Sequence, residues 1–462
     1  MLNSTSKRAV TSSPAKLLQL VQKTLCAAAL FGLSASLAHA VPSYARQTGS
    51  DCASCHVGSY GPQLTPYGVK FKLGGYTDSD GQDGKIPLSA MTSFGVTQTG
   101  KAPADGSAHK TNSTSMETSL FVAGRLTDNI GIFSQATTAY NERTVSLDLL
   151  DLRYARSLKL GDNEATIGLS LNNNPTLGDP FNALSQWRFP YIASKFGQDN
   201  GVGAPSPLVE SLAAAVYGLN AYTFINNSFY AEGGLYNTPS RRDLVGVNGS
   251  DMGKFKGLGY YGRVAYFKDL KRQNFSVGLL GFNASLQPDR QDQSGLADKY
   301  TDLGIDASYQ FLGNREHIFT VNTSYIKEWQ TLNFTNSGLG SDNLKNSIKQ
   351  FRLAGSYTYN QTWGLTTAFF DTRGTTDATL YSGSLNGSPT TTGYILQADW
   401  TPLGKESSWG APFANVRLGV QYTGYTKYMG GSTYNSLDVN GGSVLRNAKD
   451  NNTLMLFLWT SI

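Results

Sequence analysis

Residues 257–267, GLGYYGRVAYF, show the pattern on which the fold of this chain depends. Large apolar residues alternate along the stretch with small or polar ones, and Arg263 stands on the second face. Successive side chains of a β-strand point to opposite faces of a sheet, so this period of two residues is typical of a strand. Residues 351–358 and 415–422 repeat the scheme. From about residue 87 onward the chain is built of such segments, each about ten residues or more in length.

The second face of these segments carries charge, which argues against a soluble sandwich with a dry core. Unpaired charges are costly to bury, so we expect this face to see water, as in the lumen of a membrane barrel. A lumen that steers ions would explain the charges, and so would the ordinary polar lining of a barrel. The charged residues on this face are Glu117, Arg125, Glu232, Arg263, Asp302, Asp306, Arg352, Asp399 and Arg417.

Connections of alternating length give a second indication of a barrel. Short turns are expected at 127–129, 160–162, 225–227, 269–271, 312–314 and 360–361. Longer segments are expected near 100–113, 173–211, 239–256, 287–298, 331–347, 373–390 and 427–451. The sequence therefore predicts an all-β transmembrane barrel of about 16 antiparallel strands in the outer membrane, with its short turns facing the periplasm. The aromatic-rich stretch 178–207 either folds into the lumen or decorates the surface.

The N-terminus is expected to be an export signal. Basic residues precede an apolar run at 25–37, which ends in the small-residue sequence Ala38-His39-Ala40. That run is short for a membrane-spanning helix, which needs about 20 residues. We expect three parts: a signal peptide at 1–40, a small segment at 41–85 and the barrel at 86–462. The net charge of +5 and the lack of a Lys/Arg block give no indication of nucleic-acid binding.

The motif Cys52-Ala53-Ser54-Cys55-His56 carries the specific chemistry of the chain. Two thiols at this spacing can form thioethers with the two vinyl groups of one haem, and the adjacent imidazole can bind the iron as proximal ligand. A redox disulfide would not need His56, and zinc would need further ligands, which lie far along the chain. A plain structural disulfide remains an alternative. We predict one haem c, bound covalently by Cys52 and Cys55 with His56 on the iron.

The segment 41–85 is too small, and too often interrupted by Pro and Gly, to enclose a haem in a core of its own. It needs walls from elsewhere in the chain, and the barrel is the only candidate. We therefore expect the haem segment to lie in or near the barrel lumen and to plug it.

This chain resembles a known family, the fused monohaem cytochrome-porins that act as outer-membrane Fe(II) oxidases in iron-oxidising bacteria. The resemblance covers VPSYARQTG at 41–49, the motif at 52–56, PQLTPYG at 62–68 and FKLGGY at 71–76. Parts of the long loop also resemble the family, at 172–175, 179–180 and 189–191. Gln63 departs from the pattern, in which a Glu is expected.

The resemblance implies an oxidoreductase. Fe(II) would give one electron to the haem at the outer membrane, and the haem would pass it to a periplasmic cytochrome c or a similar carrier. Two rival functions are a porin with a structural or sensory haem, and an electron conduit for a donor other than iron. Reduction of the haem by Fe(II) would distinguish the Fe(II) oxidase from a porin with a structural or sensory haem. A panel of electron donors would distinguish it from a conduit for another donor.

The sixth iron ligand has few candidates in the mature chain. If Leu88, Phe94 and Val96 face lipid, alternation turns Met91 inward, within reach of a haem at the barrel mouth. Met and His are a usual pair of axial ligands in cytochromes c, so Met91 is our prediction for the distal ligand, with simple packing as its alternative role. The other nitrogen and sulfur donors are His109, His317, Met116, Met252, Met429 and Met455.

Overall fold

The computed structural model describes residues 42–462 except 83, 107–110, 140–143, 194–204, 406–407 and 411–413. The expected signal peptide at 1–40 lies outside the described residues, and so does His109. Within the described part, no helix is long and apolar enough to cross a membrane.

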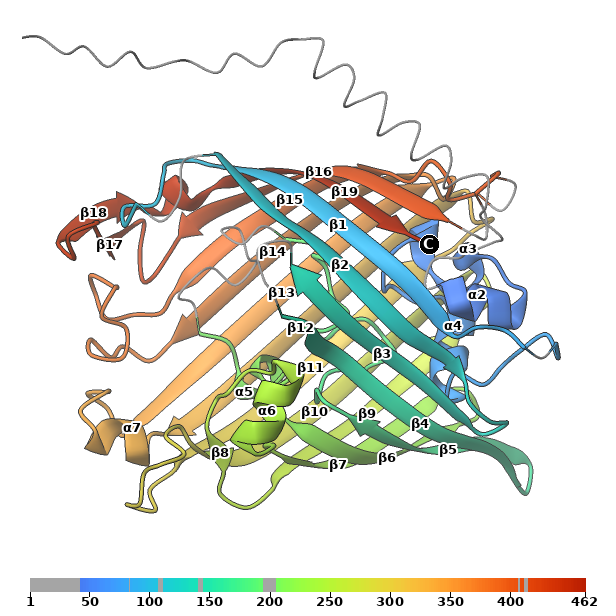
Figure 1. The fold of residues 1–462 in the computed structure, drawn as a ribbon, viewed down its shortest axis with the longest axis horizontal. Coiled ribbons are helices and arrows are strands. Elements are labelled where there is room, and N and C mark those ends of the chain that lie inside the picture. The colour runs from blue at the N-terminus through green and yellow to red at the C-terminus, as the bar shows by residue number, and fades with distance from the viewer. Residues whose placement is uncertain are drawn as a thin grey trace, which may run out of the picture. The chain divides into compact units, whose positions relative to one another are not determined.

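A closed antiparallel β-barrel forms most of the structure (Figure 1). The sheet holds 17 strands; β8 (Lys254–Phe255) is an edge piece of two residues, and the other 16 form the closed wall. Closure comes from β1, which pairs with β2 on one side and with β19 on the other. The wall strands are β1 Leu88–Thr99, β2 Thr111–Arg125, β3 Ile130–Ala139, β4 Ser146–Leu160, β5 Asn163–Asn172, β6 Tyr217–Ile225, β7 Phe229–Asn237, β9 Gly259–Asp269, β10 Gln273–Gln287, β11 Asp298–Phe311, β12 His317–Thr331, β13 Lys345–Tyr359, β14 Trp363–Gly374, β15 Thr391–Trp400, β16 Asn415–Lys427 and β19 Thr453–Ser461.

The outer face of the wall is apolar, as the alternation predicts. In β9, Tyr260 and Val264 are exposed whereas Tyr261 and Arg263 are buried. Trp363 and Trp400 stack on the outside at 5.7 Å, in the manner of an interfacial aromatic girdle. A closed barrel with an apolar exterior is the architecture of bacterial outer-membrane proteins, so the predicted fold and the outer-membrane location are confirmed.

Short turns gather at one end of the barrel and long loops at the other, and all six expected short turns are confirmed. The connection between β15 and β16 also lies at the short-turn end, although it is longer. Short turns of bacterial barrels face the periplasm. The long loops carry the remaining elements: α5 Leu208–Ser211, α6 Arg241–Val247, α7 Asn333–Ser337, β17 Thr433–Leu437, β18 Ser443–Asn447 and η2 Ala448–Asn451.

The N-terminal segment folds into short helices that contact the barrel at its short-turn end (Figure 1). Gln310 of β11 donates to the Leu64 carbonyl (2.8 Å), and Tyr222 of β6 donates to the Leu73 carbonyl (2.8 Å). Asn415 of β16 donates to the Ser59 carbonyl (2.7 Å). These contacts from separate parts of the wall hold the segment firmly. Its helices are α2 Pro42–Thr48, α3 Cys52–Cys55, η1 Val57–Ser59 and α4 Pro66–Leu73.

The long loop after β5 folds into the lumen. Of the two positions expected for it, lumen and surface, the first is therefore the one observed. Asn182 donates to the Pro62 carbonyl (2.7 Å) and accepts from the Leu64 amide (2.8 Å), so this loop meets the N-terminal segment. The Asp179 carboxylate accepts from Arg263 of the wall (3.2 Å). We call residues 173–193 the lumen loop.

The expectation that the charged inner face sees water is wrong for most of its residues. The lumen loop, α5 and other side chains of the wall supply partners for its charges. Arg263 binds Asp179 and Asp306, and the Asp302 carboxylate accepts from the Val209 amide (2.8 Å). Arg125 is exposed and Glu117 is partly exposed. The buried members are Glu232, Arg263, Asp302, Asp306, Arg352, Asp399 and Arg417.

Candidate functional site

The Cys-x-x-Cys-His motif forms one turn of helix followed by an extended residue. Asp51 caps α3, because its carboxylate accepts from the Ser54 amide (3.1 Å). The His56 amide donates to the Cys52 carbonyl (2.9 Å), and the backbone of His56 then becomes extended. This geometry places both cysteines and the histidine on one short, well-defined piece of backbone.

A second piece of backbone, at 63–68, packs closely against the motif. The Val57 amide donates to the Gln63 carbonyl, and the Thr65 amide donates to the Cys55 carbonyl, both at 2.9 Å. Gly68 of α4 lies against the motif, since a Cβ atom there would come within 2.4 Å of the Cys55 oxygen. A side chain at this position would push α4 away from the motif.

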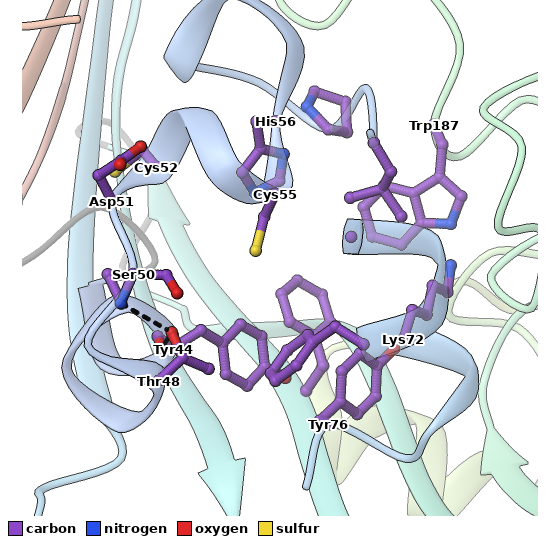
Figure 2. A pocket seen from close by; sticks show the side chains of 16 residues that line it. Tyr44, Thr48, Ser50, Asp51, Cys52, Cys55, His56, Lys72, Tyr76 and Trp187 are labelled. Atoms are coloured by element: carbon purple, nitrogen blue, oxygen red, sulfur yellow. Dashed lines mark hydrogen bonds between the residues drawn. The ribbon is translucent and has the colours of Figure 1, made fainter. Parts of the chain in front are cut away.

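The motif opens onto a cavity with mostly apolar walls, which include several aromatic rings (Figure 2). Cys52, Cys55 and His56 line it together. In Figure 2 the Cys55 sulfur points into the cavity near the His56 ring. Opposite them lie Tyr44 and Tyr76, whose rings stack at 5.4 Å. The structure thus brings together all three residues that the motif predicts for haem attachment.

The environment of His56 keeps its imidazole neutral. Burial lowers the pKa of His56 to about 4, and the Gln63 backbone beside the ring partly opposes this shift. Its Nδ1 atom is inaccessible and has no hydrogen bond of good geometry. Neutral imidazole is the form that binds a metal ion.

Neither Cys52 nor Cys55 forms a disulfide. Burial raises the pKa of the Cys55 thiol to about 12, so this thiol is protonated at neutral pH. Among the described residues no group of three or more His, Cys, Asp or Glu side chains could hold a metal ion. A metal at this site would therefore depend on His56 together with ligands from a prosthetic group.

The chemistry of the cavity fits a haem, because its apolar walls and aromatic rings match an apolar macrocycle. The two thiols would hold the macrocycle, and the buried imidazole would supply the proximal nitrogen.

Met91 faces inward, as the alternation predicts, and lines a second cavity together with His56. The cysteines line only the first cavity, so ligation by Met91 stays a prediction. Two of the rival donors point elsewhere. Met116 is 47% exposed, and the exposed His317 binds the Tyr357 hydroxyl through Nδ1 (2.8 Å).

The sequence reasoning did not single out Lys72, and it placed Trp187 in the aromatic-rich stretch 178–207 without linking it to the motif. Lys72 is buried, and its Nζ donates to the Leu177 and Asp179 carbonyls of the lumen loop at 2.7 and 2.8 Å. Trp187 comes from that loop to line the cavity, with Lys72 Nζ 4.5 Å from the centre of its ring. The one signal for a contact between Lys72 and Trp187 was that residues 71–76 and parts of the long loop resemble the same family.

No model of a known protein family matches the chain, and no curated protein matches it. Solved outer-membrane barrels are similar in architecture. An anion-selective porin from Comamonas acidovorans is 11% identical, with 81% of this chain and 98% of that chain covered and a TM-score of 0.46. The channel DcaP of Acinetobacter baumannii is 11% identical (82% and 97% covered, TM-score 0.45), and OmpF of Salmonella typhi is 13% identical (82% and 98% covered, TM-score 0.46).

The fold and its apolar exterior define the class of this protein, a porin-like β-barrel of the outer membrane. That assignment rests on the strand pairing and on the lipid-facing side chains. Nothing about function is carried over from the similar barrels, whose sequences differ widely from this one.

Proposed function

We propose that this protein is an outer-membrane cytochrome that takes electrons from Fe(II) outside the cell and passes them to a periplasmic cytochrome c or a similar carrier. One observation carries the proposal: the thiols of Cys52 and Cys55 and the imidazole of His56 line a single aromatic cavity. The resemblance of 41–76 to the fused monohaem cytochrome-porins supports Fe(II) as the donor.

When bound, one haem c would supply the one-electron redox chemistry. The residues of the chain hold and shield it. Cys52 and Cys55 would carry the thioether bonds, and neutral His56 would donate its ring nitrogen to the iron. Phe71 and Trp187 form part of the apolar wall around the site.

The position of the site favours transfer to a periplasmic partner. The motif lies near the short turns, because Arg315 from the turn between β11 and β12 donates to the Ala53 carbonyl. Short turns face the periplasm, so a soluble carrier can approach this end of the barrel. Oxidation at the outer membrane also keeps insoluble Fe(III) products out of the cell.

Two experiments test the proposal in order. Haem-dependent peroxidase staining after denaturing electrophoresis should be positive for the wild type and negative for Cys52→Ala/Cys55→Ala. Equal staining of both would contradict the haem assignment. A panel of anaerobic donors then tests iron: if other donors reduce the haem and Fe(II) does not, the protein is a conduit for another donor.

A channel with a structural or sensory haem is the second candidate. The observation in its favour is a polar strip of partly exposed residues along the inside of β1–β4, consisting of Ser93, Glu117, Gln135, Thr137 and Asp148. Measurement of the single-channel conductance in planar bilayers tests this second candidate. Large, steady conductance with a haem that Fe(II) does not reduce would favour the channel.

A further inference from the structure

A second cavity, of about 280 Å³, adjoins the first. The two share His56, Pro62, Phe133 and Trp187, so a single layer of side chains separates them. Neither cysteine lines the second cavity, although His56 and Met91, the predicted ligands of the haem iron, both do.

The walls of this second cavity include several aromatic rings and no unpaired charged side chain. Arg188 is the one charged side chain among its lining residues, and Glu210 meets both terminal nitrogens of Arg188. A hydrated metal cation would find no carboxylate in this wall, whereas a flat aromatic molecule would find several rings to stack on. Those rings belong to Tyr60, Phe121, Phe133, Trp187, Tyr191 and Trp459.

Two buried side chains of the wall offer hydrogen-bond donors. Trp459 is 8% exposed and Tyr60 is 9% exposed, and their rings pack edge to face at 4.5 Å. Neither Trp459 Nε1 nor the Tyr60 hydroxyl has a hydrogen bond of good geometry, although the Ser461 hydroxyl lies beside Tyr60. Indole N–H can only donate, so it requires an acceptor such as a carbonyl oxygen.

The polar strip gives this cavity a route toward the long-loop end. Gln135 belongs both to the strip and to the cavity wall. Its Nε2 donates to the Ser119 and Thr137 hydroxyls at 3.1 and 3.2 Å. The side chains of the strip are partly exposed, so the strip connects the cavity wall with accessible polar surface.

We propose that the second cavity binds a planar, uncharged aromatic molecule with carbonyl oxygens, of the flavin or quinone class. Its ring system stacks among Tyr191, Trp187 and the neighbouring aromatic side chains. One carbonyl oxygen accepts from Trp459 Nε1. The ligand then lies one layer of side chains from the cavity of Cys52, Cys55 and His56. This site goes beyond the proposed function and does not depend on iron being the donor.

Lumiflavin is a suitable probe, because it is water-soluble, uncharged, flat and rich in carbonyl acceptors. Equilibrium dialysis of the full-length holoprotein, with the same detergent on both sides, should show saturable binding of one lumiflavin per chain. Trp459→Phe keeps an aromatic ring but removes the donor, and should weaken binding about three- to tenfold. Trp409→Phe is the matched control, since Trp409 is 88% exposed in the connection between β15 and β16, and should leave binding unchanged.

Heat-modifiable migration on gels verifies that each variant is folded. If Trp459→Phe does not fold, Tyr191→Leu takes its place, because it removes a stacking ring from the lumen loop. Absence of saturable binding to the wild type overturns the proposal. So does binding to the folded Trp459→Phe or Tyr191→Leu variant that equals binding to the wild type.

Discussion

Replacing Asp179 with Ala should release the lumen loop from the barrel interior. The Asp179 carboxylate is fully buried and accepts from the amides of Phe181, Ala183 and Leu184, all at 2.9 Å. It also accepts from Arg263 at 3.2 Å. The substitution therefore removes one partner of a buried ion pair and the cap of three loop amides.

Breaking a buried ion pair by removing one partner costs about 3–5 kcal/mol. Arg263 keeps both hydrogen bonds to Asp306, at 2.7 and 2.9 Å, which favours the lower part of that range. A cost of about 3 kcal/mol shifts the balance between docked and released loop by roughly a hundredfold. The single-channel conductance in planar bilayers should then rise well above the wild-type level.

Asp162→Ala is the control, because Asp162 is an exposed carboxylate in the short turn between β4 and β5. It should leave the conductance unchanged. If Asp179→Ala folds and conducts like the wild type, the loop is not held in the lumen by this carboxylate and the reasoning is refuted.

Three further predictions concern the site. Met91→Ala should abolish a sulfur-to-iron charge-transfer band and lower the haem potential; an unchanged spectrum and potential would leave Met91 a packing residue. Burial lowers the pKa of Lys72 to about 7 from its usual 10.5, so between those values the folded chain binds fewer protons than the unfolded chain. The free energy of unfolding should thus rise with pH above 7 and fall toward pH 7, and Lys72→Met should remove this component in urea titrations; identical pH slopes would contradict it. Gly68→Ala should destabilise the packing of α4 on the motif by about 1–3 kcal/mol, because its Cβ meets the Cys55 oxygen at 2.4 Å. Gly246→Ala, with no atom within 4 Å, is the matched control in the same unfolding assay.

The strands, the short turns and the inward direction of Met91 could all be predicted from local sequence. A period of two residues fixes which side chains share a face, and one face of each strand had to meet lipid. The grouping of the motif residues could also be predicted from local sequence. Cys52, Cys55 and His56 lie within a single helical turn and its cap, so they cannot be far apart.

The burial of the charged inner face could not be predicted, because it depends on contacts between distant parts of the chain. Arg263 finds a partner in Asp179 of the lumen loop, and nothing local in either stretch encodes that pairing. The same holds for Lys72, whose Nζ donates to two carbonyls of that loop. Alternation assigns a side chain to a face of the wall, but it does not say what will cover that face.

An anaerobic titration of the purified holoprotein with Fe(II), followed by visible spectroscopy, tests the central claim most directly. The account predicts that Fe(II) converts the haem spectrum to the reduced form, and that Cys52→Ala/Cys55→Ala shows no such change. A wild-type haem that dithionite reduces but Fe(II) leaves oxidised would contradict it.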